Sequence, residues 1–272
     1  MLLKQNQIEK LIILVKEAGE QARKYYDFSD IRVQYKSDKS PVTIADRELS
    51  DLITAQLKQM FPHIPIISEE ADLEHNMDIL KENDTYWLID PIDGTKSFIR
   101  KKGDFTINIA LIKNKTSEFG IIYQPLKQAL YYTGADKKAY KEYNGITTQI
   151  KVNRNIKNDK ALNIVIPTRN LGEDALNFIA SLNVTSSDQV SSSFKFCLVA
   201  EGIYDMYSNF SRINTWDIAA GHAILTCAGG LIFDRKGNIL TYNKNSLRCP
   251  NFVAFSSHIG EAYIRRKLAE LL

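Results

Sequence analysis

The sequence predicts a mixed α/β protein whose two halves meet near residue 150. The chain has 272 residues, of which 44% are hydrophobic and 25% charged, a composition typical of a globular protein with a sizeable core. Apolar residues recur every three or four positions in some segments and alternate in others, which predicts both helices and strands. The pattern changes around a polar stretch at residues 140–158, yet nothing there marks a flexible linker. We therefore expect halves 1–150 and 151–272 to pack closely together.

The first half is expected to begin with helices and continue with strands. An apolar stripe between residues 8 and 22 predicts an amphipathic helix that packs on the core. A second helix is expected over residues 44–59, with Thr43 as N-cap and Asp46 in a pattern that resembles a capping box. Strand patterns then follow at 64–67, 86–89, 105–112, 119–123 and 129–133.

The second half mixes both kinds of element along its length. Helices are expected at 174–182, 193–201, 217–228 and 261–271, and strands at 164–166, 231–233 and 252–255. Glycines directly follow the second and third of these helices, as is common at helix C-termini.

Composition narrows the possible partners and compartments. The net charge of +3 is too small to indicate nucleic acid as the main partner. The three cysteines are odd in number and form no C-x-x-C pair, which fits a reduced compartment. We see no signal peptide, and the early apolar run at residues 11–15 is far too short to span a membrane. A cytoplasmic protein is expected; peripheral attachment to the inner face of the cell membrane is left open.

The most informative motif is Asp90-Pro91-Ile92-Asp93-Gly94-Thr95, which follows an apolar strand pattern. Two carboxylates lie three residues apart, and oxygen ligands suit Mg²⁺. Gly94 and Thr95 are placed to open a helix, whose N–H groups attract phosphate. Metal-assisted phosphate chemistry needs both features side by side. The alternative is an ordinary turn, because Asp and Gly beside Pro are common turn residues.

Further acidic residues stand at expected strand ends and helix starts. Glu69-Glu70 follows one strand, while Asp46 and Asp217 each lie at the start of a helix. Taken alone, the glutamates fit a solvated loop and the aspartates fit the dipole of a helix N-terminus. Together they occupy the positions where α/β proteins place ligands.

The chain resembles the Mg²⁺-dependent, Li⁺-sensitive phosphatases. This group contains inositol monophosphatases, fructose 1,6-bisphosphatases and 3'(2'),5'-bisphosphate nucleotidases. The resemblance lies in Glu69-Glu70, the motif at 90–95 and Trp216-Asp217-Ile218-Ala219-Ala220-Gly221. The stretches 103–111 and 191–202 are similar to the bacterial CysQ branch of the nucleotidases. The resemblance implies a layered αβαβα sandwich of the sugar-phosphatase type. Its N-terminal half carries a largely antiparallel sheet, its C-terminal half a smaller mixed sheet, and the site lies between them.

The resemblance also implies a metal centre with two or three Mg²⁺ ions. Glu69, Asp90 and the carbonyl of Ile92 would hold one ion. Asp90 would bridge to a second ion, which Asp93 and Asp217 complete.

The same resemblance gives catalytic roles to Asp46, Glu69 and Thr95. Thr95, supported by Asp46, would orient and help to deprotonate the attacking water. The N–H groups of Gly94 and Thr95 would bind the phosphate that is removed. No phosphorylated enzyme is expected, because no side chain stands out as a nucleophile.

For the substrate, Ser192 and Lys195 match positions that hold a second phosphate in bisphosphate nucleotidases. The alternative for Lys195 is a surface residue on a helix. Two positions depart from the family pattern, with Asn170 in place of a histidine and Asn209 in place of an arginine. We expect Arg169 and Arg212 to compensate for these losses.

The expected activity is hydrolysis of the 3'-phosphate of 3'-phosphoadenosine 5'-phosphate (PAP) to AMP and phosphate. Alternatives within the same chemistry are an inositol monophosphatase or a phosphatase for sugars such as fructose 1,6-bisphosphate. A third alternative is a non-catalytic sensor of nucleotides or phosphate. The expected partner is a small phosphorylated molecule. Homodimers are common in the superfamily, although the sequence shows no interface.

Overall fold

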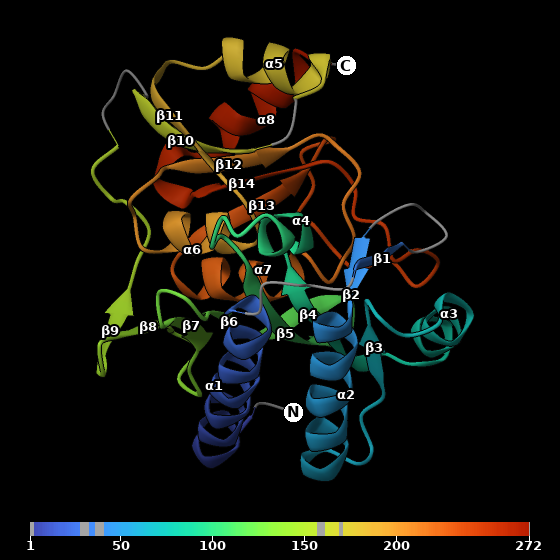
Figure 1. Ribbon diagram of the computed structural model, residues 1–272. Helices are drawn as coiled ribbons and strands as arrows, with labels where there is room; N and C mark the ends of the chain where they lie inside the picture. Colours follow the sequence, from blue (N-terminus) through green and yellow to red (C-terminus); the bar gives the residue numbers. More distant parts are fainter. Residues whose placement is uncertain (1–2, 28–32, 36–40, 157–160, 169–170, 272) are drawn as a thin grey trace.

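The computed structural model describes residues 3–27, 33–35, 41–156, 161–168 and 171–271. Two β-sheets alternate with three layers of helices, which gives the αβαβα sandwich that the resemblance implied (Figure 1). A short antiparallel pair, β1 (Val33–Tyr35) and β2 (Pro41–Thr43), stands beside the layers.

The first layer consists of α1 (Gln5–Asp27) and α2 (Ile44–Met60), both predicted from sequence. Their apolar faces pack on one side of the larger sheet and form one continuous core with it. The expected capping box at the start of α2 is present, with reciprocal hydrogen bonds between Thr43 and Asp46. This cap fixes the orientation of the Asp46 side chain.

The larger sheet has seven strands in the order β3-β4-β5-β6-β7-β8-β9. β3 and β4 are parallel and every other pair is antiparallel, as expected for this half. The strands are β3 (Ile66–Ser68), β4 (Thr85–Asp93), β5 (Thr106–Lys113), β6 (Thr116–Gln124), β7 (Ala129–Thr133), β8 (Ala139–Tyr143) and β9 (Ile146–Ile150). The sequence did not predict β8 and β9, because both carry polar side chains; β9 is the exposed strand at the edge, and most of β8 beside it is half-buried.

The middle layer consists of α6 (Phe194–Ala200) and α7 (Ala219–Cys227), which lie between the two sheets (Figure 1). All seven residues of α6 are buried. α7 crosses the larger sheet at Gly120, where an added Cβ would lie 2.1 Å from the carbonyl oxygen of Ala220. Glycine at this position therefore lets the backbones of helix and strand touch.

The smaller sheet has five strands in the order β11-β10-β12-β14-β13 and is mixed, as expected. Its outer face is covered by α5 (Glu173–Ala180) and α8 (Glu261–Ala269), the latter after a 3₁₀ turn at Ser257–Ile259. The strands are β10 (Leu162–Pro167), β11 (Val184–Val190), β12 (Met206–Asn209), β13 (Gly230–Asp234) and β14 (Phe252–Ser256). The sequence missed β11 and β12; β11 is an exposed, polar strand at the edge.

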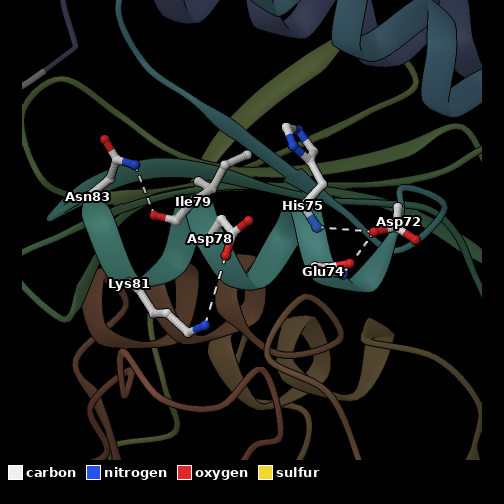
Figure 2. Close-up of polar contacts among 7 residues, drawn as sticks. All are labelled: Asp72, Glu74, His75, Asp78, Ile79, Lys81 and Asn83. Atoms are coloured by element: carbon white, nitrogen blue, oxygen red, sulfur yellow. Dashed lines mark hydrogen bonds and ion pairs between the residues drawn. The ribbon is translucent and has the colours of Figure 1, made fainter.

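One helix was not predicted: α3 (Leu73–Glu82), which connects β3 to β4. Most of its residues are exposed, so its apolar stripe is weak. Figure 2 shows its polar contacts, including the N-cap Asp72, whose carboxylate accepts hydrogen bonds from the N–H groups of Glu74 and His75. Capping of this kind supports a helix whose sequence shows little periodicity.

Candidate metal centre

The motif at 90–95 lies within a strand and at its end. β4 continues to Asp93, whereas the strand was expected to end at Ile89; Asp90 pairs with Asn108 and Asp93 with Thr106. The register shifts between the two aspartates, so a bulge displaces Pro91 and Ile92 from the ladder.

Within this bulge the two oxygens of Asp90 differ. Oδ1 accepts a hydrogen bond from the N–H of Ile92 at 3.1 Å, while Oδ2 is buried and has no hydrogen-bond partner among the described residues. An unpaired buried carboxylate oxygen is costly unless a cation meets it. Asp90 therefore fits a metal ligand.

Three carboxylates from separate elements converge here. Ligand oxygens of Glu69, Asp90 and Asp217 all lie within 4.8 Å of one another. Glu69 directly follows β3, which runs parallel to β4, and its N–H donates to the carbonyl of Ile89 at 3.1 Å. Asp217 lies two residues before α7, slightly outside the helix that was expected to start with it.

The electrostatics of this cluster also favour a cation. Burial raises the pKa of Asp90 well above its usual value, and the charges of Glu69, Asp93 and Asp217 raise it further. Burial likewise raises the pKa of Asp217, together with the charges of Asp93 and Glu69. Carboxylates this close cannot all ionise unless positive charge compensates them. A divalent cation supplies that charge.

Asp93 is held by residues that the sequence did not single out. Its Oδ2 accepts hydrogen bonds from the N–H of Ser193 and from Asn108 Nδ2, the latter at 3.4 Å. The Ser193 hydroxyl in turn donates to Asn108 Oδ1 at 2.7 Å and lies 2.8 Å from Thr106 Oγ1. Burial raises the pKa of Asp93, and the ammonium of Lys195 opposes that rise. These residues lie in the two stretches similar to the CysQ branch, but only the folded chain brings them together.

Thr95 and Asp46 meet as the resemblance implied. Thr95 Oγ1 lies 3.2 Å from both Asp46 Oδ1 and the carbonyl oxygen of Ile92. The other oxygen of Asp46 accepts hydrogen bonds from the backbone N–H and the hydroxyl of Thr43, at 2.7 and 2.6 Å. The cap that starts α2 thus orients the carboxylate toward Thr95.

Thr95 is the first residue of α4 (Thr95–Ile99), which follows Gly94. Gly94 has φ +97°, a left-handed conformation, and an added Cβ would lie 3.0 Å from the carbonyl oxygen of Asp104. Glycine is therefore needed at this turn. In the first turn the Ser97 N–H donates to the carbonyl of Gly94 at 2.8 Å, whereas the N–H groups of the first two helical positions have no acceptor within the helix.

The loop that carries Glu69 is held by hydrogen bonds from residues of α3 and α2. Asn76, buried on α3, donates from Nδ2 to the carbonyl of Ser68 at 2.7 Å and accepts from the Ser68 N–H at 3.3 Å. The Ser68 hydroxyl lies 2.7 Å from that of Ser50 on α2. Sequence reasoning missed Asn76, because it lies in a helix that was not expected.

A cleft opens beside the carboxylates. Its walls come from both halves of the chain and are lined by Asp93, Gly94, Lys96, Ser97, Pro167, Thr168, Ser191, Ser192, Ser193, Lys195, Phe196, Tyr207, Ile213 and Asp217. Ser192 precedes α6 with φ +57°. Lys195 is only 5% exposed, and its Nζ donates to the carbonyl oxygens of Val190 at 3.2 Å and Ser192 at 2.5 Å. The alternative reading of Lys195 as a surface residue is therefore wrong.

Of the two arginines expected to compensate for the departures, the structure describes Arg212 alone. Arg212 is exposed and does not line the cleft, although its neighbour Ile213 does. Arg169 and Asn170 lie outside the described residues. Asn209 is buried, and its side chain bonds to Ser211 and so closes the loop after β12.

Among the described helices, none is long and apolar enough to cross a membrane.

Comparison with known proteins shows to which family the chain belongs. The model of the inositol monophosphatase family matches residues 4–270. The 3'(2'),5'-bisphosphate nucleotidase CysQ of Salmonella typhimurium is 36% identical over 248 residues, which cover 90% of this chain and 98% of that protein. The corresponding protein of Escherichia coli K12 is 34% identical over 247 residues, with the same coverage of both chains.

Solved structures give the same result. CysQ from Bacteroides thetaiotaomicron, a bacterial member of the inositol monophosphatase family, has a TM-score of 0.79 and 32% identity, and the match covers 94% of this chain and 99% of that one. An IMPase of Thermotoga maritima has a TM-score of 0.78 and 25% identity, with 98% of both chains covered. The chain belongs to the inositol monophosphatase family.

Proposed function

We propose that this protein is a Mg²⁺-dependent phosphatase that hydrolyses the 3'-phosphate of PAP to give AMP and phosphate. The observation that carries the proposal is the cluster of Glu69, Asp90 and Asp217 at the edge of a cleft that also contains Lys195. Carboxylates suit a divalent cation and lysine suits a phosphate. The relatives named 3'(2'),5'-bisphosphate nucleotidase support the choice of substrate.

The residues present fit a centre with two or three Mg²⁺ ions. Glu69, Asp90 and the carbonyl of Ile92 would hold one ion, and Asp90, Asp93 and Asp217 a second. Bound there, the ions would neutralise the phosphate and lower the pKa of water. The unpaired Oδ2 of Asp90 and the raised pKa values in the cluster fit this assignment.

Thr95, supported by Asp46, would accept the proton of the attacking water. With its own hydrogen directed to Asp46 Oδ1, the Thr95 hydroxyl presents a lone pair that can accept a proton. Asp46 already accepts two hydrogen bonds from Thr43, so its carboxylate is held in place for this role. The N–H groups of Gly94 and Thr95 would bind the oxygens of the phosphate that leaves.

In the same cleft, Ser192 and Lys195 would meet the rest of a bisphosphorylated substrate. Arg169 and Arg212 follow and precede the lining residues Thr168 and Ile213 in the chain, and their positive charges would favour a phosphorylated substrate. If Arg212→Ala leaves the KM for PAP unchanged, the role of Arg212 is excluded.

The activity test is phosphate release by the purified protein with Mg²⁺. PAP, inositol 1-phosphate and fructose 1,6-bisphosphate are compared, each with and without Li⁺. We expect PAP to be hydrolysed fastest and Li⁺ to suppress the reaction. Preference for an inositol or sugar phosphate would replace the proposed substrate. Release from none of them, with Mg²⁺ binding intact, would favour a non-catalytic sensor.

We also propose that residues 1–150 and 151–272 are two halves of a single folding unit. α6 and α7 of the second half cover the large sheet of the first. Expressed alone, residues 1–150 would expose this apolar face, so circular dichroism should show no cooperative unfolding. A cooperative transition of the fragment would contradict the proposal.

A further inference from the structure

Two lysines line the cleft, and their environments differ. Lys195 is buried, donates to two backbone carbonyls and lies with its Nζ 5.0 Å from the centre of the Tyr207 ring. Its charge also stabilises the carboxylate of Asp93. Lys195 thus holds the loop before α6 and balances the charge of Asp93, in addition to any contact with a ligand.

Lys96 differs from Lys195 in being exposed to solvent. It is the second residue of α4, directly after Thr95, and is exposed. Among the described residues its ammonium takes part in no ion pair. A lysine on a flexible stem with no protein partner can move to meet an anion.

The cleft wall around Lys96 is suited to phosphate. Ser97 follows it in the chain, and the Ser97 hydroxyl is 3.1 Å from that of Ser191, which also lines the cleft. Among the described residues, the only acidic side chains in the lining are Asp93 and Asp217, both part of the carboxylate centre. The other polar side chains of the lining are hydroxyl groups, the buried ammonium of Lys195 and the exposed ammonium of Lys96.

We propose that Lys96 is a specificity-determining residue that binds the second phosphate of a bisphosphorylated substrate. The inference rests on the proposed function, which places the phosphate to be removed at Gly94 and Thr95. Lys96 follows these residues in the same helical turn, so its side chain borders the space next to that phosphate. A substrate with one phosphate offers this ammonium no second anion.

The role predicts an effect on binding rather than on the chemical step. The second phosphate does not react, so its contact with Lys96 has the same strength in the ground state and the transition state. Loss of such a contact raises KM and leaves kcat unchanged. Because Lys96 is exposed, the effect should also weaken as ionic strength rises.

The experiment compares PAP with adenosine 3'-phosphate, which lacks the second phosphate, at saturating Mg²⁺. For Lys96→Met we expect KM for PAP to rise about tenfold, the usual scale for one charge-assisted hydrogen bond. The kcat for PAP and both constants for adenosine 3'-phosphate should stay within about twofold of wild type. Lys96→Arg should keep most of the affinity for PAP, since it keeps the charge.

Lys102→Met is the matched control. Lys102 is exposed on the same segment, just beyond α4, but does not line the cleft. This control should leave the KM for PAP unchanged. A thermal melt of each variant shows that it is folded.

Two results would overturn the proposal, and they differ in what else they affect. An unchanged KM for PAP in Lys96→Met, or an equal rise for both substrates, would overturn the role of Lys96 alone. Wild-type protein with no preference for PAP over adenosine 3'-phosphate would overturn the bisphosphate specificity itself, and the role of Lys96 with it.

Discussion

At the scale of single residues, Ser193 of the second half contacts Asp93 and Asn108 of the first half, beside the proposed metal site. Its N–H holds Asp93, and its hydroxyl holds the side chain of Asn108 in the orientation that lets Nδ2 face Asp93. Groups that orient a metal ligand commonly affect metal affinity by 10–100-fold when they are removed.

We therefore expect Ser193→Ala to weaken Mg²⁺ binding by about tenfold or more. The serine N–H remains in this variant, so the loss reports the hydroxyl and its hold on Asn108. Calorimetric titration with Mg²⁺ measures the effect without relying on activity. Ser187→Ala, exposed on β11, is the control. Wild-type affinity in Ser193→Ala would show that the hydroxyl does not position Asp93.

His222 determines part of the response of stability to pH. It is buried on α7, its Nδ1 lies 3.1 Å from the Tyr242 hydroxyl, and burial lowers its pKa from 6.5 to about 4. Between these values the unfolded chain binds a proton that the folded protein does not, so stability falls as pH drops from about 6.5 to 4. At about 1.4 kcal/mol for each pKa unit, the lowered pKa of His222 reduces the free energy of unfolding by roughly 3 kcal/mol over this pH range.

Replacing this histidine should remove that dependence. Measured by urea unfolding without metal, His222→Gln should lose less stability than wild type between pH 6.5 and pH 4. His258→Gln, at an exposed position, should follow wild type. Parallel curves for His222→Gln and wild type would mean that His222 is not the group responsible.

At the scale of elements, α3 acts as a support for the loop that carries Glu69. Its contact is the double hydrogen bond between the buried amide of Asn76 and the backbone of Ser68, one residue before Glu69. The exposed face of the same helix carries an ion pair between Asp78 and Lys81, 3.9 Å apart (Figure 2). Exposed pairs of this kind contribute little to stability.

The two faces of α3 give a matched pair of variants. Asn76→Ala should lower the free energy of unfolding by about 1–3 kcal/mol, because the buried N–H of Ser68 loses its acceptor. It should also weaken Mg²⁺ binding through the displaced Glu69. Asp78→Asn should change neither quantity measurably. If Asn76→Ala lowers stability but binds Mg²⁺ as wild type does, α3 supports the fold and not the centre.

At the scale of the whole molecule, the site depends on how closely the middle helices approach the larger sheet. α7 follows Asp217 and crosses β6 at Gly120. The Ser117 hydroxyl donates to the carbonyl of Ala219 at 2.7 Å and fixes the same contact. Any shift of α7 away from the sheet therefore moves Asp217 relative to Asp90.

We expect Gly120→Ala to destabilise the protein by about 1–3 kcal/mol, as overpacking of a core does. The added methyl group meets backbone, which cannot turn aside, so Mg²⁺ affinity should fall together with the melting temperature. Gly172→Ala is the control, because nothing lies within 4 Å of its added Cβ. Normal Mg²⁺ binding in Gly120→Ala would mean that Asp217 does not depend on this contact.

The sequence by itself determined the elements with strong local signals. The helical stripe of α1, the capping box of α2 and the alternation in β5 depend on neighbours only a few residues apart. The carboxylates of the motif and the layered fold followed from the resemblance. The polar strands β8, β9 and β11 carry no such local signal, since their neighbours in the sheet define them.

Which groups position the carboxylates of the site depends on how distant segments pack together. Ser193 and Asp93 are 100 residues apart in the chain, and Ser193 and Asn108 are 85 apart. The burial of Lys195 and the exposure of Lys96 likewise depend on how α6 and α4 pack. A local pattern records the periodicity of one element, whereas such contacts exist only after two separate elements have been packed against each other.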